Sequence, residues 1–378
     1  MIKRIVTNAI VKGQKDGFVN IIYGPRRVGK TVLLQQLMEQ LGVKKEKLTW
    51  FNGDTEEARE ALGTTAETKL SALVDKFEYV VIDEAQRIDN IGLALKIMID
   101  KFPTKKFYVS GSSSLALSAG IQEPLTGRAI KYCLYPLSTV ELTAGIEEYQ
   151  KLTLLEQQLI YGGYPYLRQL TKNNEKEAYL KSIVADYLFK DVLLLADINL
   201  PETLRRLTTL LAFQVGLEVS LSGLAGKLEI DVKTVQRYLS LLKQGFVIFE
   251  VGAYSKNLRK EVVKSKKYYF WDTGIRNALI GQFMPLASRL DTGRLWENFL
   301  AVERMKRFEY KREAVDCYFW RTWDQAEIDW VEMKNGKLKA FEFKFGQDKK
   351  ARTPKAFWET YGQKVKVVNK ENYLDFVG

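Results

Sequence analysis

The eight residues GPRRVGKT at positions 24–31 constrain the fold more than any other stretch of the chain. The apolar run 19–23 precedes them and the amphipathic segment 32–38 follows, which predicts a strand, a glycine-rich turn and a helix. The spacing is that of a phosphate-binding loop, in which backbone N–H groups and a helix N-terminus face an anion. A chance match in a surface turn is the alternative, and the flanking strand and helix argue against it.

The residue types in this motif suit the binding of ATP and Mg²⁺. Gly24 and Gly29 let the backbone approach a polyphosphate closely. We expect Lys30 to reach the β- and γ-phosphates and the Thr31 hydroxyl to enter the Mg²⁺ shell. The expected nucleotide-binding residues are Gly24, Pro25, Arg26, Arg27, Val28, Gly29, Lys30, Thr31 and Val32.

A second motif, VVIDEAQ at 80–86, indicates hydrolysis. Its apolar run ends in Asp83 and Glu84, and a buried parallel strand delivers such acids to the sheet edge where ligands bind. We expect Asp83 to hold Mg²⁺ through water and Glu84 to polarise the attacking water. A strand end with a solvated acid pair is the alternative, and the phosphate loop favours ATP hydrolysis over it.

Composition excludes several classes of chemistry. The chain of 378 residues has no histidine, which removes Ser-His-Asp, Cys-His and histidine-zinc sites, and its two cysteines are far apart. No apolar run reaches the roughly 18 residues of a membrane span and no signal peptide is evident, so we expect a cytoplasmic protein. The net charge of +12 favours a polyanion such as nucleic acid, although basic residues also simply solvate a surface.

Five motifs together resemble a prokaryotic AAA+/STAND-like P-loop ATPase with an extra C-terminal module. They are GPRRVGKT, VVIDEAQ, VSGSSS (109–114), LTGRAIKYCLYPLS (125–138) and GGYP (162–165). The resemblance implies Ser112 as polar sensor, Arg128 as an arginine finger acting in trans in a homo-oligomer, and Pro165 near the nucleotide at a helical lid. A serine-rich turn without a role and a surface ion pair are the alternatives for Ser112 and Arg128.

The middle of the chain resembles a winged helix-turn-helix. Ser222 and Asp231 are expected to cap two successive helices, and a strand follows near 246–251. The second helix would present Lys233, Thr234, Gln236 and Arg237 to phosphates and base edges. Six of the twelve residues in the expected wing, 256–267, are basic: Lys256, Arg259, Lys260, Lys264, Lys266 and Lys267. This clustering favours DNA over the alternative, a winged helix used for protein packing.

The last part of the chain predicts a helix at 295–303 and three strands, at 316–320, 327–332 and 338–344, with a hairpin turn at Asn335-Gly336. Four residues resemble the restriction-endonuclease-like PD-(D/E)XK superfamily: Glu297, Asp329, Glu342 and Lys344. The resemblance implies that the acids bind Mg²⁺ and the lysine assists the attacking water, although no proline precedes Asp329. A degenerate fold kept for DNA binding or assembly is the alternative.

The expected fold is therefore α/β, with a P-loop parallel sheet and further modules. The expected domains are an AAA+-like ATPase core at 1–150, a helical lid or connector at 151–212, a winged helix at 213–285 and a nuclease-like domain at 286–378. Three functions stay open. They are a DNA-associated ATPase whose nucleotide state moves basic modules, an ATP-powered Mg²⁺-dependent nuclease, and a nucleotide-gated switch that binds a protein.

Overall fold

A computed structural model of the chain describes residues 2–112, 123–185, 201–255, 266–322, 324, 326–346 and 352–378. It divides into two compact units, Met1–Tyr135 and Pro136–Gly378. The first unit ends at Tyr135 and not at residue 150. The reason is that the residues after it bond within the second unit, where the Leu137 N–H donates to the Gly163 carbonyl over 2.7 Å.

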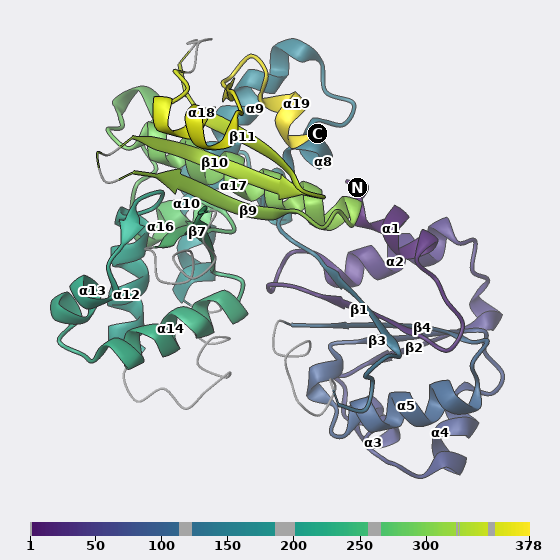
Figure 1. The fold of residues 1–378 in the computed structure, drawn as a ribbon. Helices are drawn as coiled ribbons and strands as arrows, with labels where there is room; N and C mark the ends of the chain where they lie inside the picture. Colours follow the sequence, from purple (N-terminus) through teal and green to yellow (C-terminus); the bar gives the residue numbers. More distant parts are fainter. Residues whose placement is uncertain are drawn as a thin grey trace. The chain divides into compact units, whose positions relative to one another are not determined.

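The first unit is a parallel sheet with the strand order β2-β3-β4-β1-β5. Its strands are β1 (Val19–Tyr23), β2 (Leu48–Asn52), β3 (Tyr79–Asp83), β4 (Lys106–Gly111) and β5 (Ala129–Cys133). Its helices are α1 (Val6–Lys12), α2 (Lys30–Gln40), α3 (Glu56–Leu62), α4 (Glu67–Val74) and α5 (Ile91–Lys101), with short 3₁₀ turns η1 (Lys45–Lys47) and η2 (Ala85–Arg87). Figure 1 shows α1 and α2 on one face of the sheet and α3, α4 and α5 on the other.

Burial on both faces explains why the three central strands, β3, β4 and β1, are nearly continuous apolar runs. Ile21, Ile82 and Val109 point to the α5 side, where they join one hydrophobic core. Ile22, on the opposite face, is equally buried. The strand predicted at 19–23 and the buried strand predicted to end in Asp83 are therefore confirmed as β1 and β3.

The second unit begins with helices. They are α8 (Thr139–Thr143), α9 (Glu148–Tyr161), the 3₁₀ turn η3 (Pro165–Gln169) and α10 (Asn173–Ile183). Next in the chain come α12 (Pro201–Phe213), β6 (Glu218–Val219), α13 (Leu221–Leu228), α14 (Val232–Gln244), β7 (Ile248–Ala253), β8 (Lys266–Phe270) and α16 (Thr273–Leu279). None of the helices in the described ranges is long and apolar enough to cross a membrane.

One seven-stranded sheet continues through the rest of this unit, in the order β12-β11-β10-β9-β7-β8-β6. Its C-terminal strands are β9 (Asp316–Arg321), β10 (Glu327–Lys334), β11 (Lys337–Phe343) and β12 (Val365–Val368). β7 pairs in parallel with β9 through Gly252 and Ala253, which lie opposite Tyr318 and Phe319. Since this pairing joins the strands before and after residue 285, that expected boundary and the one at 212 fall inside a single compact unit.

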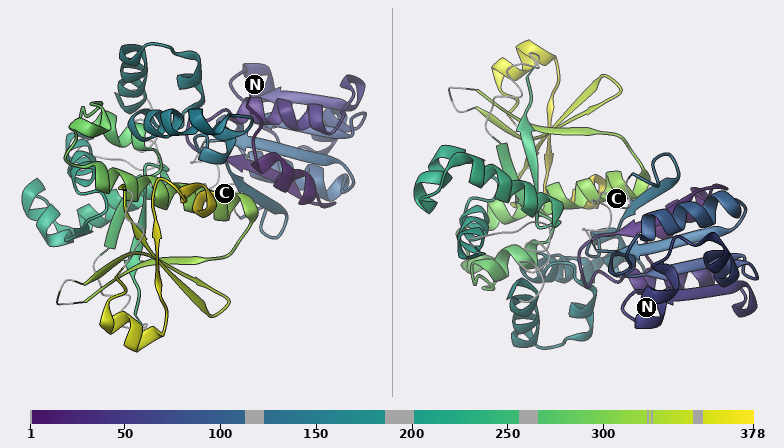
Figure 2. Two further views of the ribbon diagram at one scale, coloured as in Figure 1. Left: turned by 90° about the horizontal axis from the view of Figure 1, so that it is seen from above. Right: turned by 90° about the horizontal axis from the view of Figure 1, so that it is seen from below.

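Helix α17 (Thr292–Lys311) supports this sheet. Figure 2 shows it, in green, lying across the C-terminal strands. Phe376 of α19 (Tyr373–Val377) packs on Phe341 and Phe343 of β11. Phe357 of α18 (Lys355–Tyr361) packs in a separate core with Val331 and Ala340. The remaining short element is the 3₁₀ turn η5 (Leu286–Ser288).

One expected turn and one of the two expected helix caps in this unit agree with the structure. The hairpin at Asn335-Gly336 is confirmed, with φ of 50° and 74° at the two residues. Asp231 caps α14, because its Oδ1 accepts from the Thr234 N–H over 2.9 Å. The expected cap at Ser222 is wrong. Ser220 is the N-cap of α13 and accepts from the Gly223 N–H, so the helix begins one residue before Ser222.

Replacing Gly162 by alanine should destabilise the second unit more than a similar change at Gly281. Gly162 has φ 77° and ψ −160°, a region essentially restricted to glycine, and an added Cβ would collide with the Asp272 carboxylate. Gly281 also has positive φ, at 65°, but open space around it. We expect Gly281→Ala to cost about 1–2 kcal/mol in the free energy of unfolding and Gly162→Ala clearly more. Equal shifts in the urea midpoint would contradict this packing.

Candidate functional site

The phosphate loop lies between the C-terminal end of β1 and the start of α2. Gly24 needs to be glycine for packing, because an added Cβ would collide with the Leu134 carbonyl. Gly29 has φ 91° at the N-cap of α2, with no neighbour close to its Cβ position. The Lys30 ammonium is buried and donates to the Gly24 and Pro25 carbonyls over 3.2 and 3.1 Å. The expected phosphate-facing lysine is thus held inside the loop.

Arg4 supports this loop from the N-terminal segment, and no sequence motif pointed to it. Its buried guanidinium donates to the Val28 carbonyl over 2.8 Å and to the Tyr135 carbonyl over 2.6 Å. These bonds tie the middle of the loop to the last residue of the first unit. A basic residue before the first strand carries no pattern that separates it from a surface cation, so only the fold identifies it.

The Asp83 carboxylate connects three elements at the sheet edge. Its Oδ2 accepts from the Thr31 hydroxyl of α2 over 2.6 Å. Its Oδ1 accepts from the Ser110 hydroxyl of β4 and from the Glu84 N–H, the latter over 3.1 Å. Ser110 was missed in the sequence, although β4 lies next to β3 and a hydroxyl near its end was the available signal.

Glu84 and the predicted sensor Ser112 meet through Gln86. Glu84 takes a left-handed backbone conformation, with φ 51°, directly after β3. The Gln86 side-chain amide donates to Glu84 Oε2 over 2.5 Å, and its Oε1 accepts from the Ser112 N–H over 3.2 Å. Gln86 therefore fixes the Glu84 carboxylate relative to the end of β4. The sequence placed Gln86 in the motif but gave it no role.

This donor set fits Mg²⁺ bound together with a polyphosphate. A hydroxyl and a carboxylate only 2.6 Å apart, at a helix N-terminus, are oxygen ligands of the kind Mg²⁺ takes beside phosphates. Among the described residues no cluster of three or more acidic, cysteine or histidine side chains is arranged to hold a metal. The remaining ligands would come from phosphate and water.

Arg128 lies at the end of the sheet where the strands begin, opposite the end that carries the phosphate loop. It precedes β5, which runs parallel to β1, whereas the phosphate loop follows β1. Its Nε is 2.8 Å from Asp100 Oδ1, in a pair exposed to solvent on both sides. The arrangement matches the alternative interpretation, a surface ion pair. The role of Arg128 as an arginine finger stays a prediction. It would require release of this pair and a second subunit.

The GGYP motif has a structural role in the second unit. Asp272, the N-cap of α16, accepts from the Gly163 N–H over 2.7 Å and from the Ile275 N–H over 3.0 Å. Burial raises the pKa of Asp272 to about 6. Pro165 starts the 3₁₀ turn η3. Its expected position near the nucleotide stays a prediction.

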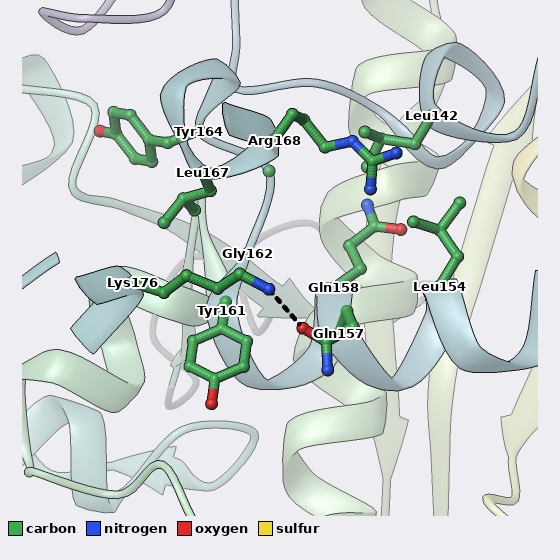
Figure 3. A pocket seen from close by; sticks show the side chains of 11 residues that line it. Leu142, Leu154, Gln157, Gln158, Tyr161, Gly162, Tyr164, Leu167, Arg168 and Lys176 are labelled. Atoms are coloured by element: carbon green, nitrogen blue, oxygen red, sulfur yellow. Dashed lines mark hydrogen bonds between the residues drawn. The ribbon is translucent and has the colours of Figure 1, made fainter. Parts of the chain in front are cut away.

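A pocket beside this motif is lined by two cationic side chains, Arg168 and Lys176 (Figure 3). Figure 3 shows the Arg168 guanidinium beside Gln158 and the Lys176 ammonium beside Gln157, and Lys176 donates to Gln157 Oε1 over 2.9 Å. Burial, helped by Arg168, lowers the pKa of Lys176. Nothing in the sequence pattern had marked this pocket.

The structure brings the four nuclease-like residues together on α17, β10, β11 and the residue directly after β11. Glu342 Oε1 is 2.7 Å from Lys344 Nζ, and Asp329 Oδ2 accepts from the Phe343 N–H over 2.7 Å. A β-bulge between Ile328 and Val331 breaks the ladder at Asp329, and bulges of this kind re-aim side chains. Burial, with Glu297 and Glu342, raises the pKa of Asp329 well above its usual range.

A fifth residue, Lys267 of β8, lies within this set. Its side chain is 1% exposed, and its Nζ is 2.9 Å from Glu297 Oε1 and 2.5 Å from Glu327 Oε1. Burial lowers the pKa of Lys267, but Glu297 and Glu327 outweigh burial and raise it overall. The prediction that Lys267 contacts DNA is therefore wrong, since its ammonium is committed to buried carboxylates. A lysine-rich sequence run cannot distinguish this residue from its exposed neighbours.

The other expected DNA contacts divide into three groups. Lys233, Gln236 and Arg237 are exposed on α14, and Thr234 donates its hydroxyl to Asp231 over 2.6 Å. Lys266 pairs with Glu250 over 2.8 Å. The remaining four lie outside the described residues: Lys256, Arg259, Lys260 and Lys264.

Comparison with known families shows three similarities. Residues 16–143 match the family described as an AAA domain. Residues 152–285 and 292–376 match two domains of unknown function, DUF8612 and DUF4143. With the five-stranded parallel sheet, the first match supports a P-loop AAA-type ATPase domain in the first unit. The matches in the second unit carry no described activity.

The chain is also similar to uncharacterised proteins from distant organisms. It is 27% identical over 330 residues to one of Mycobacterium tuberculosis, covering 86% of this chain and 70% of that protein. It is 25% identical over 343 residues to one of Haemophilus influenzae, covering 86% and 82%. It is 23% identical over 364 residues to one of Methanocaldococcus jannaschii, covering 90% and 78%.

Two solved structures of the replication initiator DnaA are remotely similar. One is bound to AMPPCP and single-stranded DNA, with 14% identity, a TM-score of 0.32, and coverage of 63% of this chain and 86% of that chain. The other, from Aquifex aeolicus and bound to AMPPCP, has 15% identity, a TM-score of 0.29 and the same coverage. At such scores the likeness supports no argument about this chain.

The stabilising contribution of Asp272 should change with pH. Its pKa of about 6 lies above the ordinary 3.8, so the folded state holds the proton more tightly than the unfolded state. The contribution of this proton uptake to the free energy of unfolding is fully present below about pH 4, and it is lost as the pH rises to about 6. We expect the unfolding free energy of the parent, relative to Asp272→Asn, to fall by about 3 kcal/mol across that window. Urea titrations that give a pH-independent difference would contradict the assignment.

Proposed function

We propose that this protein binds and hydrolyses ATP with Mg²⁺ in its first unit. The observation that supports this most strongly is the bond between Thr31 and Asp83, with Glu84 next to it. It joins the phosphate-loop helix to the acidic strand end, the two parts that nucleotide hydrolysis needs in one place. The AAA domain match over residues 16–143 supports the same assignment.

The residues of the first unit divide the work as follows. The loop N–H groups, the α2 N-terminus and the Lys30 ammonium bind and orient the phosphates. Thr31 and Asp83 hold Mg²⁺, which supplies charge neutralisation at the phosphate oxygens when bound. Glu84 accepts a proton from the attacking water, and Gln86 orients the Glu84 carboxylate.

Single substitutions separate these roles. Lys30→Ala should abolish ATP binding, because it removes the cation that faces the phosphates. Glu84→Gln should retain binding but lower kcat at least 100-fold, since an amide is no proton acceptor for water. Steady-state phosphate release and binding of a fluorescent ATP analogue measure the two effects. Lys47→Ala, which removes a surface ion pair with Glu78, is the control with parental activity. Intact hydrolysis in both site variants would rule the assignment out.

We further propose that the second unit binds DNA and that nucleotide state controls this binding. The element order α12, β6, α13, α14, β7, β8 and the sheet β7-β8-β6 are what a winged helix requires, which supports the sequence resemblance. Lys233 and Arg237 are exposed on α14, the proposed recognition helix. Asp231 and Thr234 form the cap at its N-terminus.

A lysine-rich groove in the same unit adds to this support. It is lined by Tyr254, Tyr361 and four exposed lysines: Lys337, Lys339, Lys364 and Lys366. Four cations without a carboxylate among the lining residues favour a polyanion. A nucleotide-gated switch that binds a protein is the competing function, and salt dependence separates the two.

The double variant Lys233→Ala/Arg237→Ala should weaken DNA binding and flatten its salt dependence. Each lost phosphate contact lowers the slope of log affinity against log salt by about 0.9 on duplex DNA. Fluorescence anisotropy at several salt concentrations, with and without ATP, measures this. The control variant Lys172→Ala/Lys355→Ala removes the same charge from two exposed positions, one directly before α10 and one on α18. It should leave the slope of log affinity against log salt at the parental value. Salt-independent binding by the parent would favour the protein-binding switch.

A further inference from the structure

Two carboxylates of the nuclease-like set, those of Glu297 and Asp329, lie with Glu327 around a cation of the chain itself. Lys267 Nζ lies 2.9 Å from Glu297 Oε1 and 2.5 Å from Glu327 Oε1, and the whole side chain is 1% exposed. Asp329 also faces this ammonium and interacts with it electrostatically. The lysine comes from β8, the carboxylates from α17 and β10, so three elements meet at one positive charge.

We propose that Lys267 takes the place of a divalent metal in this site, so that a cation of the chain itself lies where Mg²⁺ would bind and the C-terminal sheet is not a metal-dependent nuclease. The ammonium stands among the acids that a PD-(D/E)XK site would use for the metal. Among the described residues, no group of three or more such side chains is arranged for metal binding.

Protein donors hold each of the three acids of the set. Glu297 Oε1 accepts from the Tyr269 hydroxyl over 2.7 Å in addition to the Lys267 ammonium. Asp329 Oδ2 accepts from the Phe343 N–H, and Glu342 pairs with Lys344. A divalent ion would have to displace several of these bonds at once, and it would meet the positive charge of Lys267 at short range.

The backbone around Glu297 also leaves little room. Gly216 approaches the carboxylate so closely that an added Cβ would lie 2.9 Å from Glu297 Oε2. A metal with its usual bound waters needs space on the open side of each ligand. The site is thus closed by the segment before β6 as well as by β8.

The ion pairs of the Lys267 ammonium also hold β8 in place. β8 starts at Lys266, directly after the lysine-rich stretch 256–265 of the proposed wing. Removing one partner of a buried ion pair leaves an uncompensated charge and is strongly destabilising. Lys267 therefore anchors β8, the strand that follows the stretch 256–265, to the helix and strand that carry Glu297 and Asp329. This role holds whether or not the first unit hydrolyses ATP.

Mn²⁺ binding to the full chain, followed by electron paramagnetic resonance, tests the proposal. All variants carry Thr31→Ala and are measured without nucleotide, so that the phosphate loop contributes no site. The otherwise parental chain and Asp329→Asn should bind Mn²⁺ identically, because Asp329 holds no metal. A Mn²⁺ site that disappears in Asp329→Asn would overturn the proposal, and this comparison needs no change at Lys267.

The second part of the experiment looks for a gain of Mn²⁺ binding. Lys267→Ser opens space and removes the cation, so the number of Mn²⁺ ions bound per chain should rise by one, and adding Asp329→Asn should abolish that gain. Lys334→Ser, which breaks a surface pair with Glu313, should gain nothing. A folded Lys267→Ser chain that gains no Asp329-dependent site would contradict the proposal. Should Lys267→Ser fail to fold, the first part of the experiment decides alone.

Discussion

The carboxylate of Asp83 is the interaction on which the first unit depends. One oxygen holds Thr31 at the start of α2, and the other holds Ser110 on β4 and the backbone after β3. Three elements far apart in the sequence thus share one acceptor at the edge of the parallel sheet. Arg4 also stabilises the phosphate loop, because its guanidinium donates a hydrogen bond to the Val28 carbonyl.

The second unit is organised by charges that it buries. Besides the pairs at Lys267, Arg304 of α17 forms two bonds to Glu332 of β10, over 2.7 and 2.9 Å. Phe308 and Phe376 lie against the same guanidinium. Such pairs are costly to break from one side, which favours a single arrangement of helix and sheet. The strands of the proposed winged helix and the nuclease-like strands therefore form one body.

Local sequence signals predicted much of the fold and of the candidate site. The features that depend on contacts between distant parts of the chain were not predicted. The phosphate loop, the strand ending in Asp83 and the Asn335-Gly336 hairpin were readable because their chemistry lies within a few adjacent residues. Ser110 and Gln86 lay inside recognised motifs, but their roles depend on which strands are neighbours. Lys267 was misassigned since its burial arises from α17 and β10, which sequence periodicity cannot place beside β8.

The Mg²⁺ dependence of ATP binding shows whether Asp83 holds the metal beside the nucleotide. Isothermal titration of ATP, with Mg²⁺ and with EDTA, compares the parent with Asp83→Asn, which keeps the size of the side chain but removes its charge. We expect Mg²⁺ to strengthen ATP binding to the parent and this gain to be lost in Asp83→Asn, while binding in EDTA is similar for both. An equal Mg²⁺ gain in the two proteins, or no ATP binding by the parent, would contradict this expectation.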